Sequence, residues 1–177
     1  MEEANLKISK IKINIKVVKF VFLFIISLSI LYFLSITFES YIPLFSMRAT
    51  TKILYTFLNL IGIKSTVSTY QLIFSNFSIE VVRQCTGIFE VIAISSCILA
   101  FPTTIKKKII GIGLAIPTIY FFNMGRLVFL SLLGIYYSSI FGMVHDYILQ
   151  LTFLFLVILY WMTWINKVVR KNEVKTS

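Results

Sequence analysis

Long apolar runs separated by short basic segments are the main pattern in this chain. Four such runs lie at residues 20–38, 88–105, 109–137 and 147–166. Three of them match the about 17–25 residues that one helical crossing of a bilayer needs, and the run 109–137 is longer. The first exceeds the roughly 7–15 apolar residues of a cleaved signal sequence, so we expect it to be retained. The third is too short for two crossings and predicts one tilted or kinked helix around Pro117. The pattern predicts an all-α membrane protein with about four transmembrane helices.

The segment between the first two runs, residues 39–87, has a less regular pattern. Residues 44–63 are apolar overall but include two bases, so we expect an amphipathic helix that lies at the interface or re-enters the membrane. Residues 67–74 and 77–82 are rich in β-branched and aromatic side chains, with Ser75-Asn76 between them. This composition predicts a small β-hairpin outside the membrane.

The distribution of charge predicts the orientation of the spans. The tails 1–19 and 167–177 and the triplet at residues 106–108 together carry twelve bases, against four in residues 39–87. The positive-inside rule makes the richer side cytoplasmic. We therefore expect a multi-pass protein of the cell membrane, with both termini cytoplasmic, and treat residues 1–177 as a single polytopic domain.

Composition narrows the class of protein further. With 58% hydrophobic residues, the chain has too little polar surface for an ordinary soluble domain. The net charge of +10 does not indicate a nucleic-acid partner, because the bases cluster beside apolar runs and are not interleaved with aromatic residues. The partner that composition predicts is the lipid bilayer.

Metal and cofactor chemistry are not expected. The chain has one His and two Cys that are distant in sequence, so a closed set of metal ligands is hard to assemble. The sequence also lacks an H-E-x-x-H pair, a G-x-S-x-G elbow and a phosphate-binding glycine loop. Any chemistry must therefore come from side chains alone.

Cys85 is a candidate nucleophile because it lies at the expected amino end of the second span. The positive end of the helix dipole favours the thiolate there, and the thiolate is the nucleophilic form. The alternative is a buried packing residue, which is how most cysteines behave. We expect that packing role for Cys97, in the middle of the same span.

Arg126 is a charge inside the third apolar run. A guanidinium at such a position costs at least about 2.5–3.5 kcal/mol and needs a partner or a wet cavity. Glu90 in the second span is a candidate partner, which would make the two residues a structural ion pair. The functional alternative is that Arg126 stabilises an oxyanion, and the two roles can coexist.

His145 is the only histidine, and it lies just before the fourth span, followed by Asp146. A lone histidine in a loop is often only a solvated polar residue. In the topology derived from charge, however, Cys85, Arg126 and His145 all fall near the outer boundary. A nucleophile, an oxyanion stabiliser and a base or acid are the groups that thiol acyl transfer requires.

At these residues the sequence resembles the exosortase/archaeosortase family of membrane-embedded transpeptidases. The resemblance covers residues 44–164 and rests on Cys85-Thr86-Gly87, on Asn123-Met124-Gly125-Arg126 and on His145. Two features depart from the family pattern. Thr86 stands where the family usually has Ser, and Tyr147 to Gln150 contain no Gly, although many members have one shortly after the His. The chain resembles a minimal-length member.

The resemblance implies cleavage of a carboxy-terminal sorting signal, made of a short motif, an apolar helix and a basic tail, on exported proteins. Cys85 would form a thioester, Arg126 would stabilise the oxyanion and His145 would move the proton. The acyl group would pass to water or to an amine or lipid acceptor at the cell surface. The candidates for supporting positions around these three residues are Glu90, Asn123, Thr86 and Asp146.

Two other functions remain open from the sequence. One is a non-enzymatic membrane scaffold or small transporter subunit, in which Glu90 and Arg126 form a buried polar contact and Cys85 packs. The other is a family member that binds sorting signals without cutting them, which the two departures from the family pattern leave open.

Overall fold

The computed structural model describes residues 2–38 and 42–170 and is almost entirely helical. Parts of the predicted tails and of the segment 39–87 lie outside the described residues. The six α-helices are α1 (Glu2–Thr37), α2 (Ile42–Leu60), α3 (Ile88–Ala100), α4 (Ile105–Tyr136), α5 (Ser138–Met143) and α6 (Leu149–Trp164). The predicted class, an all-α membrane protein, is confirmed.

Three helical segments are long and apolar enough to cross a membrane, namely Ile15–Thr37, Ile105–Tyr136 and Leu151–Val169. The fourth apolar helix, α3, has 13 residues and is about 20 Å long, against a hydrocarbon core of about 30 Å. It ends at Ala100, and not at residue 105, because Pro102 restricts the residue before it to extended geometry. Phe101 accordingly has φ −70° and ψ 132°.

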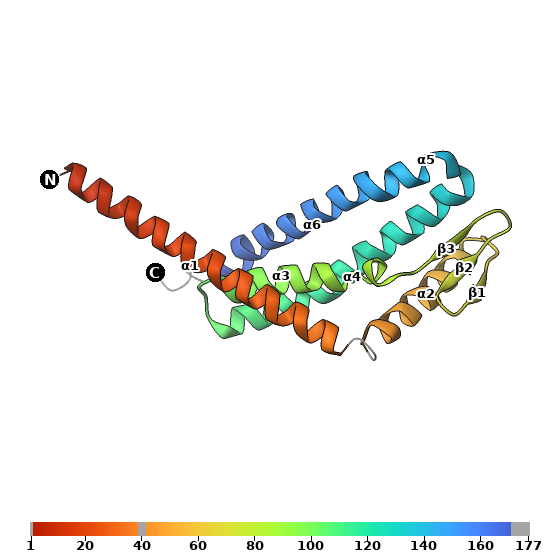
Figure 1. The fold of residues 1–177 in the computed structure, drawn as a ribbon, viewed down its shortest axis with the longest axis horizontal. Helices are drawn as coiled ribbons and strands as arrows, with labels where there is room; N and C mark the ends of the chain where they lie inside the picture. The colour runs from red at the N-terminus through yellow and green to blue at the C-terminus, as the bar shows by residue number, and fades with distance from the viewer. Residues whose placement is uncertain (1, 39–41, 171–177) are drawn as a thin grey trace.

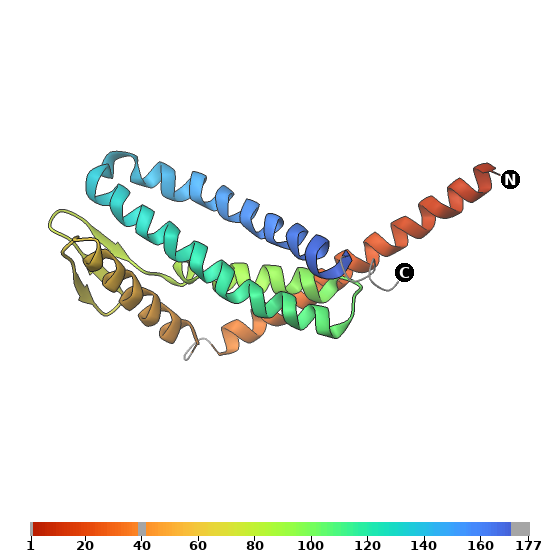
Figure 2. The same cartoon turned by 180° about the vertical axis from the view of Figure 1, so that it is seen from behind.

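The helices form an elongated bundle around α4 (Figures 1 and 2). α3 packs against α1, α4 and α6, and α6 returns antiparallel to α4 after the short α5. α3 covers the half of α4 near Ile105, whereas α2 and the sheet lie along the other half. The start of α3 therefore lies near the middle of the long axis, where all of these elements meet.

The small sheet has three strands, β1 (Thr66–Ser68), β2 (Gln71–Ile73) and β3 (Ser78–Glu80), in antiparallel order β1-β2-β3. The first predicted segment of the hairpin divides into two strands because the chain turns after Ser68. Thr69 has a φ of +51° there, in the left-handed region that non-glycine residues adopt mainly in turns. Leu72 and Ile79, which are paired across β2 and β3, are both buried.

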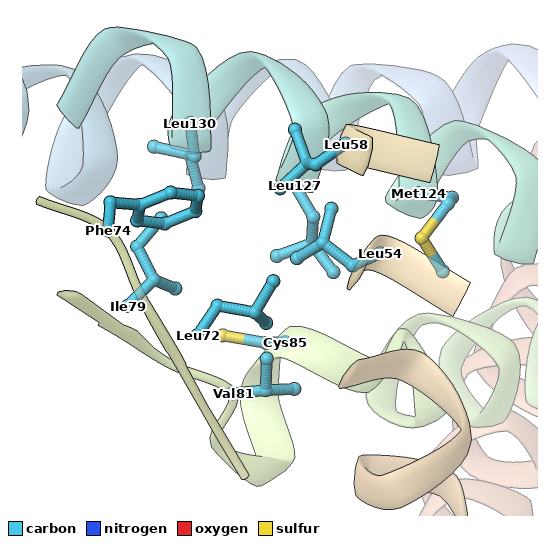
Figure 3. Packing of buried hydrophobic residues seen from close by; sticks show 10 residues of the cluster. All are labelled: Leu54, Leu58, Leu72, Phe74, Ile79, Val81, Cys85, Met124, Leu127 and Leu130. Atoms are coloured by element: carbon cyan, nitrogen blue, oxygen red, sulfur yellow. The ribbon is translucent and has the colours of Figure 1, made fainter. Parts of the chain in front are cut away.

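Two apolar clusters hold the fold together. The Cys85 cluster contains Leu54, Leu58, Leu72, Phe74, Ile79, Val81, Cys85, Met124, Leu127 and Leu130 and joins α2, the sheet and the far half of α4 (Figure 3). The Trp164 cluster contains Ile94, Ile98, Ala115, Ile119, Phe153, Trp164 and Val169 and joins α3, the near half of α4 and α6. The candidate site lies where these two clusters meet.

Candidate active site

Cys85 lies in a single 3₁₀ turn, Arg83–Thr86, that leads into α3. Its amide donates to the carbonyl of Val82 at 2.9 Å, and the Thr86 hydroxyl donates to the carbonyl of Arg83 at 2.7 Å. Gly87 then has a φ of +77°, which only glycine adopts without strain. The buried Thr86 side chain therefore closes the turn that presents Cys85.

Asn123 of α4 joins this turn to the second motif. Its side chain is completely buried, and Nδ2 donates to the carbonyl oxygen of Cys85 at 2.7 Å. A Cβ built at Gly87 would lie 3.5 Å from the Asn123 side chain, which is an ordinary van der Waals contact, so the positive φ and not crowding by Asn123 favours glycine here. The structure thus brings together two motifs that are 38 residues apart.

The thiol of Cys85 is enclosed by apolar side chains. Cys85 is 6% exposed, and it points among Leu72, Val81 and the other members of the Cys85 cluster (Figure 3). Burial raises the pKa of the thiol above its ordinary value of 9.0, although the charge of Arg126 lowers it. The helix terminus was expected to favour the thiolate. That expectation is wrong for this structure, because removal from water outweighs the favourable charges.

Arg126 is half-buried on the side of α4 that faces α6. Its guanidinium lies over the ring of Phe153, with 5.5 Å from Cζ to the ring centroid, which is within the range of a cation–π contact. The Nε atom is buried without a hydrogen-bond partner. The partner that the sequence required for this charge is therefore an aromatic ring.

Glu90 lies on α3 within electrostatic range of both Cys85 and Arg126. Its Oε2 atom is buried without a hydrogen-bond partner. Among the described residues, no ion pair joins Glu90 to Arg126, so the structural salt bridge considered from the sequence is absent. The two side chains are neighbours that do not touch.

A cavity of about 480 Å³ lies between α3 and α6 and includes both side chains in its wall. Most of the remaining wall is apolar and comes from Phe89, Ala93, Leu151 and Phe153. A second cavity of about 290 Å³ lies on the other side of the contact between Arg126 and Phe153. Arg126 therefore borders two cavities and can meet a ligand in either.

His145 lies apart from these residues, in the π-helical turn Val144–Ile148. Its ring stacks on Phe141, with centroids 5.6 Å apart and 16° between the planes, and Phe141 packs against the Cys85 cluster. Phe153, which covers Arg126, is eight residues further along the chain, or roughly 12 Å at the rise of a helix. The structure brings Cys85, Glu90 and Arg126 within electrostatic range of one another, whereas the contact described for His145 is with Phe141. The side chain of Asp146 lies outside the described residues.

Phe153 is a site residue that sequence analysis missed. It is one of 17 phenylalanines, and no spacing distinguishes it from the other aromatic residues of its span. Its contact with Arg126 depends on how α6 packs against α4. The donation from Asn123 to the Cys85 carbonyl could not be foreseen either, although Asn123 itself was a candidate for a supporting position.

Comparison with known proteins identifies the family of the chain. A family model described as transmembrane exosortase matches residues 16–166, which include the Cys85 turn, Arg126 and His145. No curated protein and no solved structure matches the chain. Since the match covers most of the sequence, the chain belongs to the transmembrane exosortase family.

Proposed function

We propose that this protein is a membrane-embedded cysteine transpeptidase or protease that cleaves carboxy-terminal sorting signals of exported proteins. The observation that carries the proposal is the hydrogen bond of 2.7 Å from Asn123 to the carbonyl of Cys85. It holds a candidate nucleophile beside the helix that carries Arg126. A buried thiol, an arginine and the cavity that the arginine lines supply a nucleophile, an oxyanion stabiliser and a place for a peptide.

The length of α4 supports an outer position for the site. Arg126 lies 20 residues beyond Lys106, or about 30 Å along the helix, which equals the thickness of the hydrocarbon core. If residues 106–108 lie at the cytoplasmic surface, Arg126 lies near the outer boundary. Cys85 lies at a similar depth, because Asn123 on the preceding turn of α4 contacts it. The proposal therefore places cleavage on the extracytoplasmic side, with both termini in the cytoplasm.

In the reaction, the sulfur of Cys85 attacks the scissile carbonyl carbon, and Arg126 stabilises the negative charge that develops on the oxygen. The thiol proton passes to His145 and then to the leaving amine as the carbon–nitrogen bond breaks. The resulting thioester is attacked by water or by an amine or lipid acceptor at the cell surface. Because His145 stacks on Phe141, this route requires the turn Val144–Ile148 to rearrange when substrate binds.

The main alternative is a family member that binds sorting signals without cutting them. The burial of Cys85 favours it, because a thiol that is 6% exposed and protonated at rest is a poor nucleophile. The scaffold or transporter subunit receives less support. That role assigned a buried polar contact to Glu90 and Arg126, and no hydrogen bond or ion pair joins their side chains in the described structure.

Loss of the nucleophile distinguishes cleavage from binding. Cells that carry Cys85→Ala are compared with wild-type cells by mass spectrometry of the carboxy-terminal peptides of their membrane proteins. Cleavage predicts that some exported proteins keep an apolar helix and basic tail only in the variant. Cys97→Ala is the matched control and should process normally. If Cys85→Ala left every carboxy terminus as in wild-type cells, the enzymatic proposal would be wrong.

A further inference from the structure

The cavity between α3 and α6 contains an acid and a base that do not pair. Oε2 of Glu90 and Nε of Arg126 are both buried without hydrogen-bond partners, and both residues line the same cavity of about 480 Å³. A buried polar atom without a partner destabilises the fold. Two charged side chains that line one cavity without pairing with each other indicate a ligand that pairs with both.

The chemistry of the wall restricts what that ligand can be. Apart from these two side chains, the wall is built mainly from apolar and aromatic residues such as Phe89, Leu151 and Leu154. A cation would be attracted by Glu90 and repelled by Arg126, whereas an anion would be attracted by Arg126 and repelled by Glu90. The ligand must be neutral overall, with a hydrogen-bond donor at one end, an acceptor at the other and an apolar body.

We propose that this cavity recognises a backbone amide of the peptide substrate, with Glu90 accepting a hydrogen bond from its N–H and Arg126 donating to a carbonyl oxygen. The inference rests on the proposed function, which places a peptide beside Cys85. A peptide group is neutral and presents its donor and acceptor on opposite sides. Glu90 is then a substrate-binding residue that positions the peptide. The peptide cannot have proline at the residue whose N–H is bound, because proline lacks that donor.

The test measures peptide binding without turnover. Cys85→Ala removes the nucleophile, and Ala93→Cys places a reporter thiol in the cavity wall. The probe is a tripeptide of apolar residues, acetylated and amidated at its ends, and a set of analogues in which each amide is replaced in turn by an ester. The measured quantity is the rate at which iodoacetamide alkylates the reporter thiol at increasing peptide concentration.

The all-amide peptide should slow alkylation of the reporter, and one ester analogue should need about tenfold more peptide for the same protection, because it lacks the N–H that a carboxylate binds. Cys97 lies on the same helix and is not in the cavity wall, so its alkylation rate should not change. Glu90→Leu should abolish the difference between amide and ester. Glu90→Gln keeps an acceptor oxygen and should reduce the difference without abolishing it.

Glu80→Gln is the matched control, because it neutralises a carboxylate on β3 that is exposed and outside the cavity. Each variant is used only if Cys97 reacts at the parent rate without peptide, which shows that the fold is kept, and protection of the reporter is measured relative to the same variant's rate without peptide. Equal protection by amide and ester in the parent, or an unchanged difference in Glu90→Leu, overturns the proposal. Protection by vesicles of phosphatidylethanolamine in place of peptide also overturns it, since the site would then bind a zwitterionic headgroup.

These outcomes are independent of those for catalysis. Binding is measured in a protein that lacks the nucleophile, so it does not depend on cleavage. If Cys85→Ala abolishes processing in cells but Glu90→Leu does not alter peptide protection, the enzyme stands and the amide site falls. If the amide site is found while Cys85→Ala still processes every substrate, the catalytic proposal falls.

Discussion

Two regions of the helical bundle, the Trp164 cluster and the start of α3, differ in how their buried polar groups are hydrogen-bonded. At the Trp164 cluster, the Tyr160 hydroxyl donates to the carbonyl of Gly111 at 2.6 Å, and the Trp164 indole donates to the carbonyl of Lys107 at 3.2 Å. Lys107 in turn donates from Nζ to the carbonyl of Val169 at 2.9 Å. These bonds tie the end of α6 to the start of α4 across the bundle.

Around the start of α3, by contrast, buried polar atoms lack hydrogen-bond partners. The unpartnered atoms there are Oε2 of Glu90, the hydroxyl of Tyr120, Oδ1 of Asn123 and Nε of Arg126. Three of these four residues also line cavities. The Trp164 end has the indole of Trp161 as its own unpartnered group, and among the described residues no charged one. Most polar groups named at the Trp164 end are therefore hydrogen-bonded within the protein, whereas four polar atoms around the start of α3 are not.

The largest effect is expected for Arg126, which supplies positive charge to the reaction. Arg126→Lys keeps the charge but loses the planar fork of donors. We expect substrate processing to fall by about 10²–10³-fold, the usual loss when an oxyanion donor is removed. Precursor cleavage in cells or membranes measures it. Arg48→Lys, at an exposed position of α2, is the control, and a wild-type rate in Arg126→Lys would exclude the oxyanion role.

A smaller effect is expected for Asn123, whose hydrogen bond to the Cys85 carbonyl holds the turn before α3. Asn123→Leu removes the donor to the Cys85 carbonyl and leaves that carbonyl without its partner. The free energy of unfolding should fall by about 1–3 kcal/mol, and processing should fall because the turn with Cys85 is no longer held. Thermal unfolding in detergent and precursor cleavage measure the two effects. Asn59→Leu on α2 should change neither. A fully active Asn123→Leu protein would contradict the positioning role.

A substitution in contact with the Trp164 cluster should lower the stability of the protein without lowering the rate of substrate cleavage. In Gly111→Ala, the new Cβ would lie 2.4 Å from Nε1 of Trp164, so the ring must shift, at a cost of about 1–3 kcal/mol. Gly113→Ala is a matched control, because a Cβ there meets nothing within 4 Å and should stabilise the helix by up to about 1 kcal/mol. Thermal unfolding compares the two. If Gly111→Ala slowed cleavage by the folded protein, the claim that the Trp164 cluster serves stability and not cleavage would be wrong.

The smallest effect concerns the ionisation of Cys85. Only the thiolate is alkylated, and burial raises the pKa of the thiol above 9.0. The alkylation rate should therefore still be rising with pH at pH 9. Arg126 lowers this pKa and Glu90 raises it, so Arg126→Gln should move the midpoint up and Glu90→Gln should move it down. A midpoint below 9 in the wild-type protein, or shifts of the opposite sign, would contradict the described surroundings of the thiol.

Sequence pattern was sufficient for the features that depend on apolar length and on rare residues. Three of the four long apolar runs correspond to helices that are long and apolar enough to cross a membrane, and Cys85 and Arg126 stood out because each is rare in such a setting. The end of α3 was missed although Pro102 marks it, because the apolar pattern continues past the proline to residue 105.

Features that depend on tertiary packing were not predictable. The burial of Cys85 requires α2, the sheet and α4 to close around the turn, and no local pattern records this. The turn at Thr69 contains no glycine or asparagine from which it could be predicted. The stacking of His145 on Phe141 likewise depends on how the turn Val144–Ile148 is folded, and not on the charge pattern that placed His145 at the outer boundary.

The central claim is that Cys85 carries the acyl group of a cleaved substrate. It is tested most directly by quenching the working protein in acid and analysing its peptides by mass spectrometry. The account predicts an adduct on the peptide that contains Cys85, released by neutral hydroxylamine as expected for a thioester, and absent from the peptide that contains Cys97. Substrate cleavage that continues with no adduct on Cys85, or an adduct at a different residue, would contradict it.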